Sequence, residues 1–381
     1  MIVMSSSSTE SLASVPESFI DTPEAWKSFV DEVIASGPLD VCSIDTEADS
    51  MHSYETKLCL IQFSIRDRLA IIDPLEIGLG NLVDFPAFID HFDQVWMHGA
   101  DYDISMFSMT FDWAPKTILD TQIAARLLGI TRFGLANLLE EEYGVKLSKQ
   151  SQKADWSRRP LSEKMLAYAF NDVRYLIDLG ERFVERLKDC GRDPWFIESC
   201  DCARKNAFER DSRPESESWR ISGWGKLSPS GLNYLQHLWQ WRDDECRHLD
   251  RPAFKFLGNK ELFRMVQNLE AGKSAEPPHY LKPHYVRRMH KSIEKAETVD
   301  AKDFPAKRVR GNGIRLETDE TRFRSIQKFR NQKAEELGIE GTVIATRLSM
   351  EKLASTNLTE EEQLDGLMNW QREILSPAIS Q

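Results

Sequence analysis

The sequence lacks several features that define other classes of protein. Its six cysteines are scattered along 381 residues, and Cys200 and Cys202 form a lone Cys-x-Cys without a second cluster. A structural zinc site is therefore not expected, because such sites need four ligands, usually in two closely spaced pairs. No apolar run approaches the ~20 residues that a membrane-spanning helix needs. The first residues also lack the basic and apolar regions of an export signal.

Positive charge is scarce as well. Lys and Arg number 49 against 61 Asp and Glu, which gives a net charge of −12. This average argues against nucleic-acid binding, but local basic patches decide such contact. The tripeptide Gly-Lys-Ser at 272–274 lacks the earlier glycine of a phosphate-binding loop, so no use of ATP is expected. With no membrane segment and no export signal, the sequence predicts a soluble cytoplasmic protein.

The pattern of apolar residues divides the chain into several parts. Strand-like and helix-like segments alternate first and predict an α/β domain with a mixed sheet, whereas later segments are helical. Two stretches rich in Ser, Pro, Gly and charge interrupt the pattern and are interpreted as linkers. The predicted parts are a disordered tail (1–18), the α/β domain (19–205), a linker (206–226), a helical domain (227–300), a second linker (301–318) and a further helical domain (319–381).

Two acidic residues stand at the end of a predicted strand, in the sequence Val-Cys-Ser-Ile-Asp-Thr-Glu. Asp45 and Glu47 lie two positions apart and therefore project from the same face, while Thr46 points to the other. Acidic residues are depleted in strands, and a buried unpaired carboxylate is costly. The pair is either an ordinary solvated strand end or one half of a metal site, since hard cations such as Mg²⁺ prefer carboxylate ligands.

The remaining ligands of such a site can be found further along the chain. Asp103 follows a strand-like segment at the point where the pattern turns helical. Tyr168 and Asp172 are four residues apart on a predicted helix and so share one face. Two ions about 3.5–4 Å apart can catalyse phosphoryl displacement, and a tyrosine next to them can orient the attacking water.

These residues carry a resemblance to a known family. The segments Ser-Ile-Asp-Thr-Glu (43–47), His-Gly-Ala-Asp-Tyr-Asp-Ile (98–104) and Tyr-Ala-Phe-Asn-Asp (168–172) resemble the three exonuclease motifs of the DEDD superfamily, in its tyrosine-containing branch. Together with the intervening sequence, these motifs resemble ribonuclease D over residues from about 20 to 300, and the similarity continues more weakly to residue 375. The resemblance implies a ribonuclease H-like exonuclease domain followed by all-α bundles of the HRDC type.

The resemblance also implies roles for single residues. Asp45 would bridge two divalent ions, Mg²⁺ or Mn²⁺. Glu47 and Asp172 would complete the site of the ion that binds the attacking water. Asp103 would help to hold the second ion, and Tyr168 would orient the nucleophile.

Several residues are candidates for contact with the substrate. The segment 146–164 carries six basic and two acidic residues, so we interpret it as a phosphate-contacting loop rather than as a merely solvated one. His98 is either a structural histidine or a substrate contact. Asp120 is either a helix cap or a substrate-side residue, with capping favoured. The candidate substrate contacts are Thr46, His98, Lys149, Gln152, Trp156 and Arg158.

The second motif contains two acids, because Asp101 precedes Asp103 by two positions. The family pattern puts the acid directly after an aromatic residue and before an aliphatic one, which selects Asp103. Asp101 is then expected to cap the helix that begins there.

The predicted function is a metal-dependent 3′–5′ exoribonuclease that trims structured RNA such as tRNA precursors and releases nucleoside 5′-monophosphates. Segment 286–315, with nine basic and four acidic residues, is expected to provide an additional binding site for RNA. The chain is predicted to act as a monomer. The alternatives are a DNA exonuclease with the same chemistry and an RNA-binding adaptor with an inactive site.

Overall fold

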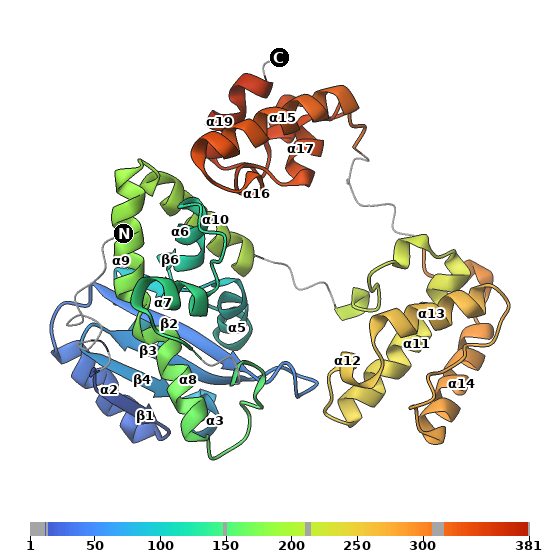
Figure 1. The fold of residues 1–381 in the computed structure, drawn as a ribbon. Helices are drawn as coiled ribbons and strands as arrows, with labels where there is room; N and C mark the ends of the chain where they lie inside the picture. Colours follow the sequence, from blue (N-terminus) through green and yellow to red (C-terminus); the bar gives the residue numbers. More distant parts are fainter. Residues whose placement is uncertain (1–11, 13, 148–150, 210–214, 307–315, 380–381) are drawn as a thin grey trace. The chain divides into compact units, whose positions relative to one another are not determined.

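A six-stranded mixed sheet organises the first half of the chain (Figure 1). The computed structural model describes residues 12, 14–147, 151–209, 215–306 and 316–379. The strands lie in the order β1-β4-β3-β2-β5-β6. β3 runs antiparallel to both of its neighbours, β4 and β2, and the other adjacent pairs are parallel. Their bounds are Glu17–Ile20 (β1), Val41–Ala48 (β2), Leu58–Ile65 (β3), Arg68–Ile72 (β4), Gln94–Met97 (β5) and Ile118–Asp120 (β6).

The predicted mixed sheet is confirmed, and so is the α/β class of this domain. The N-terminal boundary differs from the prediction, because Glu17 and Ser18 already belong to β1 and pair with Leu69 and Ala70 of β4. The serine-rich composition hid this strand, since only Ile20 of its four residues is buried. Of the predicted tail 1–18, residues 1–11 and 13 lie outside the described residues.

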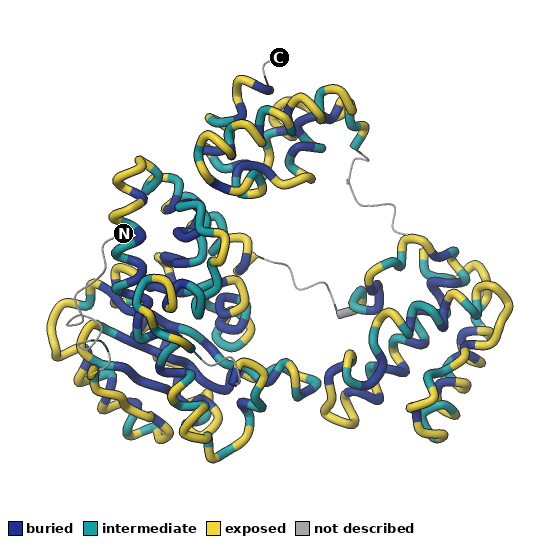
Figure 2. Tube along the Cα trace, viewed as in Figure 1, coloured by how far each residue is buried: buried dark blue, intermediate teal, exposed yellow. Residues whose placement is uncertain are grey.

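Helices cover both faces of the sheet, whose central strands are mostly buried (Figure 2). Both faces carry apolar side chains. On one face Ile44, Phe63 and Ile72 pack with residues of α2 and α5, and on the other Leu60 and Ile71 pack with residues of α8 and α9. The helices of this part are Pro23–Ala35 (α2), Pro74–Ile77 (α3), Phe85–Ile89 (α4), Asp101–Phe111 (α5), Thr121–Leu127 (α6), Leu135–Tyr143 (α7), Glu163–Arg174 (α8), Leu176–Asp189 (α9) and Asp193–Phe208 (α10).

The last helical block shares an apolar core with this domain. The sequence predicts a separate domain over 319–381, but in the structure the described residues of this block, 316–379, belong to the same compact unit as the sheet. Trp370 stacks on Trp195 of α10 with ring centroids 4.9 Å apart, and Glu198 accepts hydrogen bonds from the backbone N–H groups of Asn369 and Trp370. The helices of the block are Glu320–Leu337 (α15), Gly341–Ile344 (α16), Arg347–Leu353 (α17), Glu360–Leu364 (α18) and Asn369–Ile379 (α19).

Replacing Trp370 with alanine is therefore expected to lower the free energy of unfolding by about 3–5 kcal/mol, the usual cost of removing a buried large aromatic side chain. Trp370 is 3 % exposed, so the loss leaves a cavity between α10 and α19. Urea unfolding followed by circular dichroism measures the change. Leu348→Ala is the control, because Leu348 lies in the same block but is 58 % exposed. Equal effects of the two substitutions would contradict the shared core.

A second compact unit consists, in the described part of the chain, of residues 49–57 and 215–306. Its helices are Pro229–His248 (α11), Ala253–Phe256 (α12), Asn259–Glu270 (α13) and Pro283–Glu297 (α14). Trp219 and Ile221, which the sequence analysis places in a linker, are buried in the apolar core of this unit. The absence of periodicity around them concealed their burial. Within the described ranges, no helix is both long and apolar enough to cross a membrane.

The two helical blocks repeat one local arrangement. Buried Arg242 of α11 donates a hydrogen bond to the carbonyl of Leu257, and Arg330 of α15 donates one to the carbonyl of Ala345. In each block the acceptor lies 15 residues after the arginine, at the end of a four-residue helix. The weak sequence similarity between the blocks thus corresponds to the same packing of an arginine under a short helix.

Candidate active site

The site lies where β2 extends beyond its neighbour. β5 pairs only with residues 41–43 of β2, through Gln94, Val95 and Trp96. The chain then leaves β5 and begins α5 at Asp101, so the end of β2 that carries Asp45 and Glu47 has no strand on that side. This end of β2 still pairs with β3, but the missing neighbour on its other side leaves space next to Asp45 and Glu47.

Asp45 and Glu47 lie on the face of β2 that α8 covers. Ser43, two positions earlier and on the same face, donates to the carbonyl of Val173 on α8 at 3.1 Å. Tyr168 and Asp172 lie on this same helix, and Tyr168 donates a hydrogen bond to Asp172. The i and i+4 spacing therefore brings both residues to the strand end that bears the two acids.

Asp103 approaches from the other face of the sheet. Thr46 points to that face, as the alternation of the strand predicts, and its hydroxyl donates to Asp103 at 2.5 Å. Thr46 is 7 % exposed and Asp103 is 5 % exposed. Thr46 is predicted to contact the substrate, but in the structure its side chain turns toward Asp103. Thr46 therefore positions an acidic side chain.

A cavity of about 360 Å³ opens over this cluster. Asp45, Tyr168 and Asp172 line it together with two of the candidate substrate residues, His98 and Gln152. The other lining residues are Gln122, Gly134, Leu135, Ala136, Asn137 and Leu147. Segments that are far apart in the sequence thus form one hollow next to the acidic residues.

The four carboxyl groups hold protons more tightly than isolated ones. Burial raises the pKa of Asp45 well above its usual range, and Asp103, Asp172 and Glu47 raise it further. Burial, Asp172 and Asp103 raise the pKa of Glu47 to about 9. Burial and Asp103 raise the pKa of Asp172 to about 8, although the hydrogen bond from Tyr168 opposes the shift. The pKa of Asp103 rises to about 7 through burial, although hydrogen bonds from Thr46 oppose the shift. A cluster of like charges without basic partners has this behaviour.

The donor set fits a hard divalent cation, because it consists of carboxylate oxygens in a buried place where a cation would neutralise them. Among the described residues, no three His, Cys, Asp or Glu side chains are already gathered as the ligands of one ion.

Asp120, His98 and Asp101 lie near the second motif, and the structure shows the contacts of each. Asp120 caps α6 by accepting from the backbone N–H of Gln122 at 2.7 Å, as predicted, and it also accepts from Gly99 and Ala100. His98 combines both interpretations, because its Nδ1 lies 2.8 Å from the Thr121 hydroxyl while its side chain lines the cavity. Asp101 is the first residue of α5 rather than its cap.

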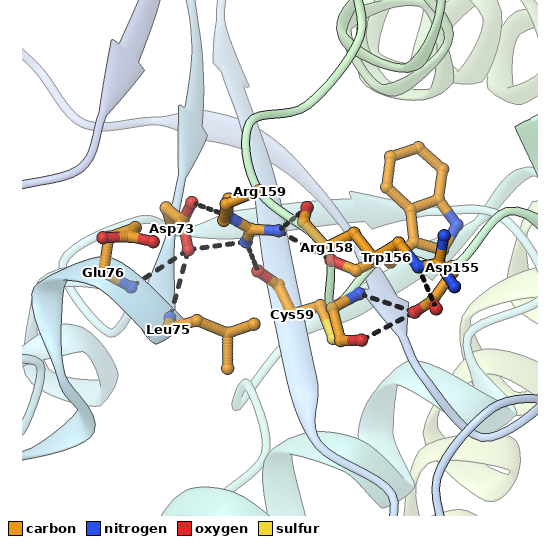
Figure 3. A network of polar contacts seen from close by, with 9 residues as sticks. Cys59, Asp73, Leu75, Glu76, Asp155, Trp156, Arg158 and Arg159 are labelled. Carbon is orange, nitrogen blue, oxygen red and sulfur yellow. Dashed lines mark hydrogen bonds and ion pairs between the residues drawn. The ribbon is translucent and has the colours of Figure 1, made fainter.

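The basic segment before α8 differs from the prediction. Arg158 is exposed and pairs with Asp155 at 2.9 Å, whereas Arg159 is held by both carboxylate oxygens of Asp73 and by three backbone carbonyls (Figure 3). Trp156 is 1 % exposed, so its ring packs in the core instead of facing a bound strand. Lys149 lies outside the described residues. Less of the segment's charge is therefore available to phosphates than its composition suggests.

Three further polar residues lie near the acids and were not predicted from the sequence. Gln122 and Asn137 line the cavity, from the starts of α6 and α7. Gln62 of β3 lies directly across from Asp45, is fully buried, and has no hydrogen-bond partner among the described residues. The alternation of β3 put Gln62 on one face with Ser64, but only the register between β2 and β3 reveals that Asp45 is its neighbour.

Comparisons with known proteins agree with this geometry. Residues 18–188 match the family model of a 3′–5′ exonuclease domain. The ribonuclease D of Xanthomonas oryzae is 27 % identical over 355 residues, covering 92 % of this chain and 94 % of the relative. The ribonuclease D of Musicola paradisiaca is 29 % identical over 327 residues, covering 82 % and 84 %.

Solved structures share the fold. The crystal structure of Escherichia coli RNase D, described as an exoribonuclease involved in structured RNA processing, superposes with a TM-score of 0.70 at 23 % identity and covers 95 % of this chain and 97 % of that one. A protein from Bifidobacterium adolescentis superposes with a TM-score of 0.75 at 23 % identity, covering 96 % of each chain. With the exonuclease domain and the full-length relatives, these findings lead to one conclusion. The chain carries a 3′–5′ exonuclease domain and is similar over almost its whole length to ribonucleases D, which supports its assignment as a 3′–5′ exoribonuclease.

Proposed function

We propose that this enzyme trims the 3′ ends of structured RNA, such as tRNA precursors, by two-metal hydrolysis that releases nucleoside 5′-monophosphates. The observation that carries the proposal is the convergence of four acidic residues and Tyr168 from three separate segments, next to a cavity that Asp45, Tyr168 and Asp172 line. Asp103 and Asp172 are buried, and Asp45 and Glu47 are half-buried. A buried group of like charges is costly for stability, so a function must maintain it.

Exonucleases of this superfamily generally use divalent metal ions. In our proposal two ions, Mg²⁺ or Mn²⁺, would share Asp45 as a ligand. Glu47 and Asp172 would hold the first ion, and Asp103 would help to hold the second. When bound, the ions lower the pKa of water and neutralise charge on the phosphate. Thr46 contributes by donating to Asp103, which fixes the orientation of that carboxylate and favours its ionised form.

Tyr168 is proposed to orient the attacking water. Burial and the neighbouring carboxylates raise the pKa of its hydroxyl far above the usual range, so the side chain stays protonated. A protonated tyrosine donates one hydrogen bond and accepts another. Tyr168 therefore positions the nucleophile, and it does not act as a base.

The helical blocks are proposed to be HRDC-type domains that assist RNA binding. The basic segment 286–315 supports this proposal through α14, whose exposed face includes Arg287 and Lys291. Residues 307–315 of the segment lie outside the described residues. The monomeric state, the cytoplasmic location and the independence from ATP stay predictions from the sequence.

Matched substrates test the proposed function. We expect the purified protein to shorten a 3′-extended tRNA in the presence of Mg²⁺ and to leave it intact with a chelator, because carboxylates alone cannot activate water. A DNA of the same length and 3′ sequence is expected to be degraded more slowly. Thin-layer chromatography of the products identifies nucleoside 5′-monophosphates.

Two results would point to the alternatives. Faster degradation of the DNA would indicate a DNA exonuclease with the same chemistry. Binding of the tRNA without any metal-dependent hydrolysis would indicate an inactive adaptor. Blocking the 3′-hydroxyl with a phosphate serves as the control for direction, since removal of nucleotides from the 5′ end would continue on that substrate.

A further inference from the structure

Arg159 precedes α8, the helix that carries Tyr168, and every N–H group of its guanidinium donates a hydrogen bond (Figure 3). Its Nε and Nη2 donate to the two carboxylate oxygens of Asp73 at 2.5 and 2.7 Å, and Nη2 also donates to the carbonyl of Cys59 at 3.1 Å. Its Nη1 donates to the carbonyls of Trp156 and Arg158 at 2.7 and 2.9 Å. All five N–H donors of the guanidinium are therefore used.

One side of this network is rigid because it belongs to the sheet. Asp73 follows β4, has a fully buried side chain, and also caps α3 by accepting from the N–H groups of Leu75 and Glu76. Cys59 lies in β3 and is fully buried. Arg159 thus fastens the segment 151–160 to two neighbouring strands.

The other side of the network reaches the cavity. The carbonyl of Trp156 accepts from Arg159, and the Trp156 ring lies 6.0 Å from the ring of Tyr168, centroid to centroid. Gln152, earlier in the same segment, lines the cavity beside Tyr168. The segment held by Arg159 therefore packs Trp156 against the Tyr168 ring and contributes Gln152 to the cavity wall.

The charge of Arg159 suggests an RNA phosphate contact, but its geometry argues for another role. Its side chain is 17 % exposed, and a guanidinium whose five donors are occupied has none left for a phosphate. A bidentate pair with a buried carboxylate also fixes the orientation of the planar group, which an ammonium group cannot reproduce.

We propose that Arg159 is a positioning residue that holds Trp156 against Tyr168 and thereby fixes the tyrosine ring in the cavity. The proposal rests on the role given to Tyr168 in the proposed function. It makes the segment 151–160 a support for the catalytic tyrosine rather than a phosphate-binding loop.

A double-mutant cycle tests the coupling. Arg159→Lys keeps the positive charge but loses the forked geometry, and we expect it to lower kcat by about 10-fold to 100-fold, the scale of a displaced catalytic group. KM for RNA should change by less than about threefold, because no phosphate contact is lost. In a Tyr168→Phe background the same substitution should change kcat by less than about twofold, since the group it positions is already absent.

Matched variants separate positioning from folding. Arg66→Lys changes another bidentate arginine, which pairs with Glu181 on the surface, and kcat should stay unchanged. Asp73→Asn removes the charge of the partner while its side-chain oxygen can still cap α3, so it should reproduce the loss of kcat if Arg159→Lys fails to fold. An equal loss of kcat with and without Tyr168, or a rise in KM alone, would overturn the proposal.

Hydrogen exchange gives a readout that does not depend on activity. In the metal-free protein, Arg159→Lys should speed amide exchange about tenfold in peptides from 151–160 and from the part of α8 around Tyr168, and leave peptides from α9 unchanged. Unchanged exchange in both peptides would overturn the positioning role. If the wild type shows no nuclease activity, the proposed function fails, and the exchange result still decides whether Arg159 supports Tyr168.

Discussion

Replacing Asp45 with asparagine is expected to lower the rate of RNA hydrolysis on the order of 10³-fold, the scale seen when one group that stabilises a transition state is removed. Asp45 lies on the α8 side of β2, lines the cavity, and is surrounded by Glu47, Asp103 and Asp172. An amide keeps the shape of the carboxylate but loses its negative charge, so the affinity for a bridging cation falls. Single-turnover hydrolysis of a labelled RNA in Mg²⁺ measures the loss.

The matched control is Asp101→Asn. Asp101 begins the same helix that carries Asp103 but is exposed, so its replacement is expected to change the rate by less than about twofold. Asp45→Asn should unfold at the temperature of the wild type or above it, because removing one of several clustered acids relieves repulsion. Asp101→Asn should unfold close to the temperature of the wild type, because Asp101 is exposed. Undiminished hydrolysis by Asp45→Asn would exclude the two-metal proposal.

The stability of the metal-free protein is expected to fall as the pH rises from about 4 to about 9. In the folded state the pKa of Asp103 is about 7, that of Asp172 about 8 and that of Glu47 about 9, against ordinary values of 3.8 for aspartate and 4.5 for glutamate. Between these limits the folded state binds more protons than the unfolded one. The free energy of unfolding therefore decreases with pH in this window.

Divalent metal is expected to oppose this loss. The ions bind the ionised carboxylates and must displace their protons, so the apparent affinity for Mg²⁺ should rise by up to about tenfold per pH unit for each proton displaced. Melting temperatures in Mg²⁺ and in a chelator, measured at about pH 6 and about pH 9, should differ more at the higher pH.

The Asp45→Asn variant is the control for this second prediction, because it should melt with a much smaller Mg²⁺ effect at either pH. Isothermal titration with Mg²⁺ in two buffers of different ionisation enthalpy measures the released protons directly. A stabilisation by Mg²⁺ that is equal at both pH values, or the release of no protons, would contradict the raised pKa values of the acidic cluster.

The sequence by itself determined the acidic residues of the site and the class of chemistry. Asp45 and Glu47 at i and i+2 of a strand share a face, and Tyr168 and Asp172 at i and i+4 of a helix share a face. These relations are local, since they depend only on the repeat of one element. The alternation of strands and helices likewise predicted the mixed sheet, because the period of the apolar residues changes with the element.

Only the tertiary structure decided how distant residues meet. The pairing of β2 with β3 puts Gln62 across from Asp45, and the short pairing of β5 leaves room for Asp103 to reach Thr46. The sequence does not distinguish Arg159 from the other basic residues of its segment, because its partner Asp73 is distant in the chain. The last helical block likewise joins the sheet through Trp195 and Trp370. These outcomes depend on contacts between segments far apart in the chain, which the period of a single element does not encode.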